Sequence, residues 1–354
     1  MATGGTGGIE SLARDYANLS TNNNYFVFFW GGGVNAEKIK ASGHNVIELG
    51  VGRKEFFKTY TKLKKLVDEY GIEAIVTHHA APMFYVYMML LKNRSKDLRT
   101  LIYAHGNLTD MLRAERKGVF FRKQIFAFAY KRCTKLIAIS NSVKNSIGNY
   151  GFNTDKIQVI YNGVDCKKFY NSNDNTGDTV KIIYVGRLIK QKGVDMLLDA
   201  LKQIDNKCEF ECDIVGDGPE RKNLEKQLND LNMRNHISFR GTRSDVPELL
   251  KKADLFIHPA RWEEGFGISI VEAMAAGVVP IAFLKGAIPE IISDGVDGFI
   301  VQGCNADELA VALEKAVVGF RQGELQRFAE AAKEKASKFQ LEDYVELLDN
   351  AITA

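Results

Sequence analysis

Residues 254–283 read DLFIHPARWEEGFGISIVEAMAAGVVPIAF and contain one complete unit of strand, loop, helix and strand. Residues 254–258 and 278–283 are short, mostly apolar runs, which favour buried strands. Residues 267–276 have the composition of a helix, and a Gly-Phe-Gly turn stands at its start. A strand that returns through a helix to a second strand indicates a parallel pair in a doubly wound α/β sheet.

The same alternation of strands and helices runs along the whole chain of 354 residues. Strands are expected at residues 25–29, 45–49, 72–77, 99–104, 135–139 and 157–160 in the first half, and at 180–185, 208–215, 236–239, 254–258, 278–283 and 298–301 in the second. A chain of this length usually divides into two domains, and the polar segment 171–178 is the best linker. We therefore predict two Rossmann-like domains, residues 1–168 and 169–339, that face a central cleft, with a helix at 340–354 packing back on the first.

The composition is that of a folded globular protein, with 45% hydrophobic and 26% charged residues. A formal net charge of +3 is too small to indicate nucleic-acid binding. The five cysteines have no CxxC spacing and are expected to be reduced thiols, and no signal peptide is visible. The longest strongly apolar run, residues 85–91, is too short to span a membrane. We expect a cytoplasmic protein.

Positive charge is concentrated between Lys92 and Lys135, where twelve Lys or Arg residues and three acids give a local excess of +9. Within this region, residues 113–135 interleave cations with aromatic side chains on an expected helix. The pattern suits an anionic membrane surface. It is equally typical of a core helix whose phenylalanines face inward and whose cations are solvated.

A second glycine turn precedes a helix at residues 184–193, which read YVGRLIKQKG. An expected strand ends here, Gly186 turns the chain, and Arg187 and Lys192 stand before the next expected helix. Backbone amides at the start of a helix favour anions, and two cations would suit a diphosphate. The alternative is a loop with two solvated cations. The Gly-Asp-Gly-Pro turn at 216–219 lacks the third glycine of a dinucleotide fingerprint and is interpreted as structural.

Two glutamates, Glu264 and Glu272, stand on either side of the Gly-Phe-Gly turn and the start of its helix. Gly265 and Gly267 let the backbone approach a ligand, and the amides that follow can hold phosphate. Eight helical residues span about 12 Å, which is comparable with a sugar, a diphosphate and a ribose. Carboxylates accept hydrogen bonds from vicinal hydroxyls, so one Glu could hold the sugar and the other the ribose. A solvent-facing Glu272 is the alternative, which its apolar neighbours disfavour.

Together these motifs resemble the family 4 retaining glycosyltransferases of the GT-B fold (glycosyl transferases group 1) over nearly the whole chain. The resemblance is carried by residues 139–143, 159–165, 186–193, 216–219, 239–241, 264–272 and 288–290. It implies an α/β GT-B fold in which residues 1–168 form the acceptor-side domain and 169–339 the nucleotide-sugar-binding domain. It also implies transfer with retention at the anomeric carbon, a UDP-sugar as the donor substrate, no cofactor and no metal ion.

The resemblance further implies a role for each donor-binding residue. Arg187 and Lys192 would hold the donor diphosphate and stabilise the charge that grows as the sugar leaves. Glu264 would contact the donor sugar, and Glu272 the ribose hydroxyls. The other expected donor-binding residues, in the glycine turns, the phosphate cradle and the base pocket, are Gly7, Gly8, Gly186, Gly241, Arg243, Gly265, Phe266, Gly267 and Ile268.

One histidine of the first domain completes the expected catalytic set of Arg187, Lys192 and Glu264. His105 directly follows the strand expected at residues 99–104 and matches a family histidine near the reacting carbon. His78 and His79 also follow an expected strand, and they have a weaker claim.

Only residues 1–3 precede the glycine-rich loop at 4–8, where the family normally has an apolar strand, so we expect the first strand to be short or missing. We predict a retaining hexosyltransferase that moves a sugar from a nucleotide sugar to a hydroxyl of a glycan or lipid-linked acceptor, in cell-surface polysaccharide or glycolipid synthesis. Lipid-linked acceptors also favour peripheral association with the inner face of a membrane through residues 113–135. A catalytically silent nucleotide-sugar-binding partner of another transferase and a GT-B-fold epimerase are the alternatives.

Overall fold

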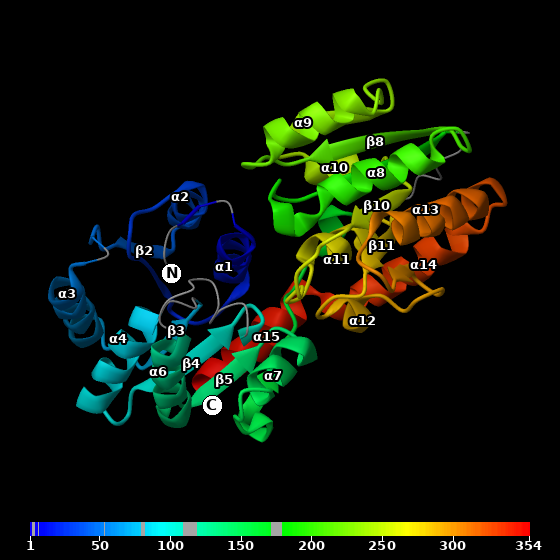
Figure 1. The fold of residues 1–354 in the computed structure, drawn as a ribbon. Helices are drawn as coiled ribbons and strands as arrows, with labels where there is room; N and C mark the ends of the chain where they lie inside the picture. The colour runs from blue at the N-terminus through cyan, green and yellow to red at the C-terminus, as the bar shows by residue number, and fades with distance from the viewer. Residues whose placement is uncertain (2–3, 6, 53, 79–81, 109–118, 171–178) are drawn as a thin grey trace. The chain divides into compact units, whose positions relative to one another are not determined.

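The computed structural model describes residues 1–354 with the exception of 2–3, 6, 53, 79–81, 109–118 and 171–178. The chain forms two compact units, one made of Met1–Gly163 and Leu341–Ala354 and the other of Val164–Gln340 (Figure 1). The first part of the first unit therefore ends at Gly163, before the expected boundary at residue 168. The expected linker, residues 171–178, lies outside the described residues.

Parallel strands form the sheets of the first unit. They are β1 (Tyr25–Phe28), β2 (Asn45–Glu48), β3 (Ala74–Thr77), β4 (Arg99–Ala104), β5 (Lys135–Ala138) and β6 (Ile157–Val159). β1 pairs with β2, while β3 to β6 form a separate four-stranded sheet in sequence order. The strands predicted for the first half are confirmed, each within two residues of its expected bounds.

The described helices of this unit are α1 (Gly8–Leu19), α2 (Val34–Ala41), α3 (Phe56–Glu69), α4 (Pro82–Arg94), α6 (Val119–Arg132), α7 (Asn141–Gly148) and α15 (Leu341–Thr353). The C-terminal α15 packs against α1 and β3. The Tyr16 hydroxyl donates to Asp349 Oδ1 at 2.5 Å, Ser20 Oγ donates to the same oxygen at 2.8 Å, and the rings of Tyr16 and Tyr344 meet edge-on. These contacts fasten the last segment of the chain to its first helix.

The first regular element among the described residues is α1, and ahead of it Met1 pairs with β1. The Met1 amino nitrogen donates to the Val27 carbonyl at 2.6 Å, and the Phe29 amide donates to the Met1 carbonyl at 3.1 Å. A cavity of about 610 Å³ is lined by consecutive residues of two strands, 25–27 of β1 and 74–77 of β3. Neighbouring residues of a strand point to opposite faces of the sheet, so a cavity on one face would contact only every second residue. This cavity contacts consecutive residues and therefore lies along the edges of the two strands. The expected place of the first strand, residues 1–3, includes residues 2–3, which lie outside the described residues.

The second unit holds one parallel six-stranded sheet. Its strands are β7 (Val180–Val185), β8 (Phe210–Val215), β9 (Ile237–Gly241), β10 (Leu255–His258), β11 (Val279–Phe283) and β12 (Phe299–Val301), which confirm the strands predicted for the second half. Their order across the sheet is β12-β11-β10-β7-β8-β9. The chain runs from β7 through β8 and β9 to one edge, and it resumes on the other side of β7 at β10. The carboxyl ends of β7 and β10 therefore form a topological switch point, where ligands bind in sheets of this type.

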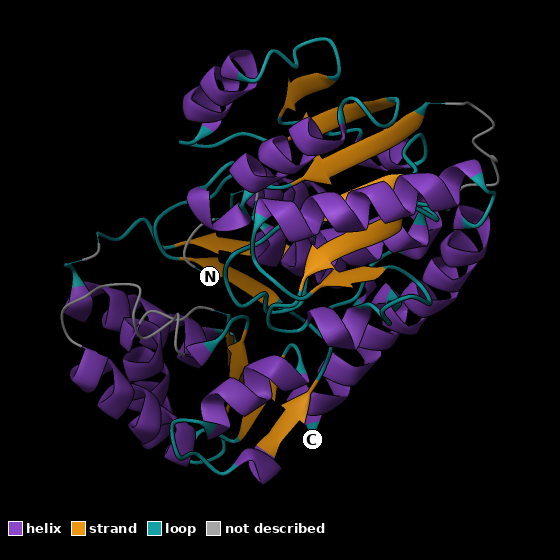
Figure 2. Ribbon diagram, turned by 45° about the vertical axis from the view of Figure 1, so that its right-hand side comes forward, coloured by secondary structure: helices purple, strands orange, loops and turns teal. Residues whose placement is uncertain are grey.

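The helices of this unit are α8 (Val194–Ile204), α9 (Arg221–Asp230), α10 (Val246–Leu250), α11 (Ile268–Ala275), α12 (Ile288–Ile291), α13 (Ala306–Arg321) and α14 (Leu325–Ala336). α8 packs against α13 and α11 against α14, and helices flank the sheet (Figure 2). The core contains the fully buried rings of Tyr184, Phe210, Phe256 and Phe283. Both units are thus α/β layers built on parallel sheets, as the GT-B expectation requires.

Candidate active site

The loop after β7 brings Arg187 to the switch point. Gly186 follows β7 directly, and a β-carbon there would lie 2.7 Å from the hydroxyl of Tyr184. That hydroxyl donates to the Arg187 carbonyl at 3.0 Å and holds the loop in place. The Arg187 side chain is exposed, and within the described part of the chain it forms no salt bridge. An exposed guanidinium without a counter-ion is suited to an anionic ligand.

Gly193 lets the same loop approach the loop that follows β10. It comes after the short 3-10 helix Lys190–Lys192, has a φ of +70°, and would place a β-carbon 1.9 Å from the carbonyl oxygen of Pro259. Only glycine tolerates both the left-handed backbone and this close approach. As a result Lys192, from the first loop, lies beside Glu264, from the second.

Glu264 is the centre of the site. One of its carboxylate oxygens, Oε2, accepts hydrogen bonds from Lys192 Nζ at 2.7 Å, His258 Nε2 at 2.9 Å and Trp262 Nε1 at 3.3 Å. The side chains of Lys192, Glu264 and His258 are 17%, 14% and 3% exposed, so water screens these contacts weakly. Lys192 Nζ also lies 5.1 Å from the centre of the Trp262 ring.

The surroundings decide the protonation states of the two titrating partners. Burial by itself would raise the pKa of the Glu264 carboxyl, but the hydrogen bond from His258 and the charge of Lys192 outweigh burial and hold that pKa well below its usual range. Burial, and then the positive charge of Lys192, lower the pKa of His258. At neutral pH the site therefore contains an ionised carboxylate and a neutral imidazole.

Neither His258 nor Trp262 is among the residues predicted for the site. His258 ends the apolar strand β10, and a histidine at the carboxyl end of a strand is a signal that could have identified it. No feature of the sequence identifies Trp262 as a site residue. Its indole N–H reaches the Glu264 carboxylate, two residues later in the chain, only because of the conformation of the folded loop.

The predicted phosphate cradle, Gly265, Phe266, Gly267 and Ile268, forms the turn into α11. Gly267 has a φ of +94° and is the N-cap of the helix, and because glycine has no side chain it makes no cap bond to the amides of the first turn. Phe266 is buried and packs edge-on against Phe339. This packing anchors the turn and leaves its backbone beside Glu264.

The other predicted donor-binding residues of this unit differ in how accessible they are. Glu272 is half-buried in the middle of α11, so it is not a plain surface position. Gly241 ends β9 with a φ of +68°. Arg243, close after it, is exposed and makes a bidentate ion pair with Asp245 at 2.8 and 2.6 Å. Its guanidinium is therefore already paired, unlike that of Arg187.

In the first unit, His105 lies next to His78. The two residues directly follow the paired strands β4 and β3, and His105 Nε2 is 3.0 Å from His78 Nδ1. The ring of Tyr103 contacts both imidazoles, at centroid distances of 4.3 and 5.2 Å. Burial, and then His105, hold the pKa of His78 well below its usual value. His79 lies outside the described residues.

Gly7 and Gly8 lie at the start of α1, also in the first unit. Gly7 is the residue before the helix, and Gly8 is its first residue. A β-carbon at Gly7 would lie 2.3 Å from Glu10 Oε2. Gly7 and Gly8 themselves could contact a ligand only through their backbone, since neither residue has a side chain.

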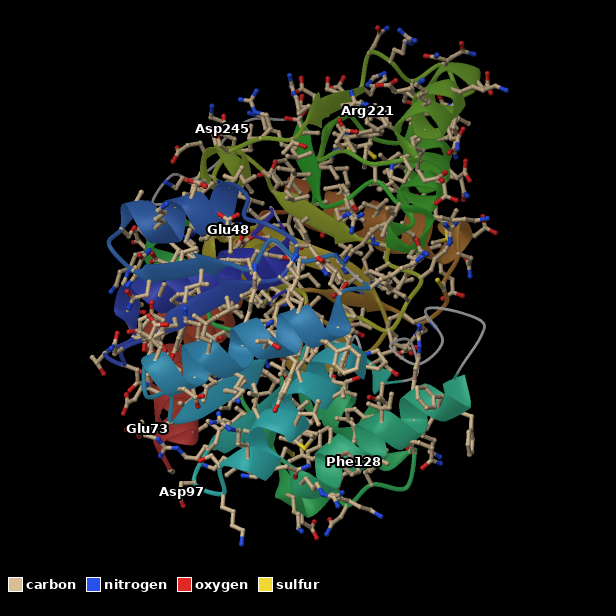
Figure 3. All side chains as sticks on the ribbon, turned by 90° about the vertical axis from the view of Figure 1, so that its left-hand side faces the viewer. Glu48, Glu73, Asp97, Phe128, Arg221 and Asp245 are labelled. Atoms are coloured by element: carbon tan, nitrogen blue, oxygen red, sulfur yellow. The ribbon has the colours of Figure 1, made fainter. Side chains whose placement is uncertain are left out.

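Helix α6 carries most of the described part of the basic stretch, of which residues 113–118 lie outside the described residues. Phe120, Phe121 and Phe128 are 76%, 68% and 44% exposed, and Phe128 is labelled in Figure 3. The fourth phenylalanine of α6, Phe126, is buried, so the inward-facing alternative holds for Phe126 and is wrong for the other three. None of the helices within the described residues has the length and apolar character needed to cross a membrane.

Comparison with known protein families gives two matches that adjoin each other along the chain. The model of glycosyltransferase family 4 matches residues 6–168, and the model of glycosyl transferases group 1 matches residues 167–335. The second match contains the whole cluster around Glu264, and the first contains His105, Gly7 and Gly8.

This chain is also similar to individual proteins, in sequence or in structure. An uncharacterized glycosyltransferase of Methanocaldococcus jannaschii is 32% identical over 308 residues, which cover 85% of this chain and 82% of that protein. The GDP-mannose-dependent α-(1-6)-phosphatidylinositol monomannoside mannosyltransferase of Mycolicibacterium smegmatis is 27% identical, covering 72% of this chain and 69% of that protein. The crystal structure of Anabaena HepE in complex with UDP has a TM-score of 0.82, 21% identity and full coverage of both chains.

Proposed function

This chain belongs to the glycosyl transferases of group 1 and family 4, and from that membership we propose that it moves a hexose from a nucleotide sugar to a hydroxyl of a glycan or lipid-linked acceptor. The single observation that carries the proposal is the cluster at the switch point of the second unit. There an exposed Arg187, a shielded Lys192–Glu264 pair and the start of α11 are found together.

In this proposal the diphosphate of a UDP-sugar binds Arg187, Lys192 and the amides at the start of α11. Lys192 uses one N–H for Glu264, which leaves its other N–H groups for phosphate oxygens. Gly186 and residues 265–268 bring the backbone close to the phosphates. The complex of Anabaena HepE with UDP supports uridine as the nucleoside of the donor.

The carboxylates and the loop after β9 then hold the rest of the donor. Glu264 accepts hydrogen bonds from hydroxyls of the sugar, and Glu272 accepts them from the ribose. Gly241 and Arg243 line the base pocket, where Arg243 keeps its pairing with Asp245. The half-burial of Glu272 supports a ligand-facing carboxylate over a solvated one.

We propose that transfer proceeds with retention by attack on the front face of the sugar. The bond between the anomeric carbon and the phosphate oxygen breaks, and the acceptor oxygen bonds to the same face of that carbon. The acceptor's proton passes to the departing phosphate oxygen. Arg187 and Lys192 stabilise the charge that grows on the diphosphate, so no metal ion is required.

His105, Gly7 and Gly8 complete the proposal from the first unit. His105 lies near the reacting carbon, and the amides at the start of α1 also contact the donor. The hydrogen bond between His105 and His78 supports a histidine held in one orientation, which a catalytic contact requires.

The test is a panel of UDP-, GDP- and ADP-sugars with purified protein and EDTA, in which donor hydrolysis, transfer and the anomeric configuration of the product are measured. We expect turnover of a UDP-sugar that EDTA does not reduce, and a product with the configuration of the donor. Glu264→Ala should lower kcat/KM between about 10- and 100-fold, as expected for the loss of hydrogen bonds to a charged group. Tight donor binding without turnover would instead support the silent partner, and inversion would contradict the proposed mechanism.

We also propose that α6 associates peripherally with the inner face of a membrane, in glycolipid or cell-surface polysaccharide synthesis. Support comes from Phe120, Phe121 and Phe128, which are exposed on a helix that also carries Lys131 and Arg132. The name of the mannosyltransferase of Mycolicibacterium smegmatis, which refers to a phosphatidylinositol monomannoside, supports a lipid-linked acceptor.

Sedimentation with vesicles that contain anionic lipid tests this association at low salt. We expect the wild-type chain to sediment and the F120S/F121S/F128S variant to remain in solution. Phe57→Ser is the matched control, because Phe57 is 83% exposed on α3 and should not affect binding. If the wild-type chain stays in solution, or if Phe57→Ser weakens binding as much as the triple variant, the association through α6 is wrong.

A further inference from the structure

His258 is buried at the end of β10 and donates to the carboxylate that we assign to the donor sugar. We propose that His258 is a positioning residue, which holds Glu264 so that its other oxygen, Oε1, faces the donor. The inference rests on the proposed function, because it assumes that Glu264 contacts the sugar. It adds a residue to which neither the motifs nor the family matches assign a role.

The first step of the argument is that Oε2 of Glu264 is fully engaged. It receives Lys192 Nζ, His258 Nε2 and Trp262 Nε1 within 3.3 Å, while a carboxylate oxygen has about two lone-pair sites. No donor among the described residues reaches Oε1. The free hydrogen-bonding capacity of this shielded carboxylate therefore lies on one atom, and a sugar hydroxyl is a donor that would use it.

The second step concerns the proton between His258 and Glu264. An ionised carboxylate only accepts hydrogen bonds, so the proton in the 2.9 Å contact belongs to His258 Nε2. His258 Nδ1 is buried and has no hydrogen-bond partner among the described residues. Protonation would place an N–H group at this unpartnered atom and a second positive charge near Lys192, both of which are unfavourable. His258 is therefore neutral, and its single ring N–H, on Nε2, donates to Glu264.

The third step is that the imidazole cannot easily turn. The His258 ring is nearly parallel to the ring of Phe256, with an interplanar angle of 16° and a centroid distance of 6.4 Å. β10 pairs with β7 on one side and with β11 on the other, where His258 lies opposite Ala282. Ala287 holds the Glu264 backbone, because its amide donates to the Glu264 carbonyl at 2.8 Å. The sheet thus holds the His258 end of the contact, and the loop between β11 and α12 holds the Glu264 end.

Three variants separate positioning from mere packing. In His258→Gln the amide nitrogen can reach the place of Nε2 and still donate to Glu264. In His258→Asn the shorter amide reaches only the level of Nδ1, and His258→Leu has no polar group. The measurements are kcat and KM with the UDP-sugar that turns over in the panel, the affinity for UDP, which lacks the sugar, and the thermal midpoint.

We expect His258→Leu and His258→Asn to lower kcat/KM about tenfold or more, as for the loss of a hydrogen bond to a charged group. His258→Gln should stay within about threefold of the wild type, and all three should bind UDP within about twofold of it. Full activity of His258→Leu, equal losses in His258→Gln and His258→Leu, or a fall in UDP affinity that matches the fall in activity would each overturn the inference. A wild-type chain that fails to bind UDP or to turn over any donor would contradict the proposed function instead.

Discussion

Breaking the ion pair between Lys192 and Glu264 from one side should be strongly destabilising. Lys192 Nζ and Glu264 Oε2 are 2.7 Å apart, and the two side chains are 17% and 14% exposed. Lys192→Met leaves the carboxylate with uncharged donors only, and Glu264→Gln leaves the ammonium without its counter-ion. We expect each substitution to lower the free energy of unfolding of the second unit by about 3 kcal/mol. This is the lower end of the cost for a buried pair, because both groups keep some contact with solvent.

The double variant K192M/E264Q should lose less than the sum of the two single losses, because it removes both charges together. We expect a coupling energy of about 2 kcal/mol between the positions. Urea unfolding measures it, with Trp262 fluorescence as the signal in a Trp30→Phe background. The chain has two tryptophans, Trp30 in the first unit and Trp262 in the second, so the signal then reports the second unit alone.

The pH dependence of the same unfolding gives an independent check. The folded pKa of Glu264 lies below the unfolded value of about 4.3, so the stabilisation is present above that value and is lost as the pH falls through the folded pKa. Lys192→Met removes a charge that lowers this pKa, so the folded pKa moves toward the unfolded value. The acid loss of stability should therefore be smaller, and end at a higher pH, than in the wild type. A coupling energy below about 0.5 kcal/mol, with the same acid limb in both proteins, would refute the reasoning, because solvent would then screen the pair.

Three further outcomes test other parts of the structure. Gly193→Ala should lower the urea midpoint of the second unit more than Gly295→Ala does. The backbone φ is near +70° at both positions, but of the two only Gly193 would place a β-carbon 1.9 Å from a carbonyl oxygen. Equal losses would mean that the backbone conformation alone sets the cost, about 1–2 kcal/mol. His78→Asn should keep most of the transferase activity, whereas His78→Phe should lose about tenfold in kcat. Only the amide can replace the Nδ1 atom that contacts His105. Equal activities of the two variants would show that this contact does not serve the reaction. Burial, and then the hydrogen bond to Asp349, raise the pKa of Tyr16 to about 12. The folded state therefore holds the hydroxyl proton more tightly than the unfolded state does. The resulting contribution to the free energy of unfolding, about 3 kcal/mol, is complete below about pH 10 and is lost between about pH 10 and 12. Tyr16→Phe should flatten that alkaline limb of first-unit stability when Trp30 fluorescence follows unfolding, and an unchanged limb would contradict the assignment.

Much of the fold could be predicted because strand and helix patterns are local. Each apolar run of four to six residues reflects burial of that segment, so its position shows in the sequence even where its partner strand is unknown. The ends of strands were less well predicted, as at residues 72–77, where β3 begins at Ala74. A strand ends where its pairing ends, and pairing depends on a neighbour elsewhere in the chain.

The site residues were predicted singly, and their mutual contacts were not. Arg187 and Lys192 appear in the sequence as two equivalent cations, yet one is exposed without a salt bridge among the described residues and the other is shielded beside Glu264. Arg243 was expected to face a ligand, and its guanidinium is paired with Asp245. Residue type and spacing indicate what a side chain can bind, whereas its partner depends on which loops meet.

The sequence by itself indicated the class of this protein through its resemblance to a known family. The motifs that carry the resemblance, glycine turns at the ends of apolar strands and a Glu pair around a helix start, are local features that can be recognised without the fold. Only the tertiary structure decided that three donors meet on one oxygen of Glu264. That meeting requires β10 to lie beside β7, so that Lys192 reaches a carboxylate 72 residues later in the chain. It also requires His258 to be buried, with no partner for Nδ1 in the part of the chain that the structure describes, which leaves its Nε2 proton as the donor. Both depend on strand order and packing, which no single segment encodes.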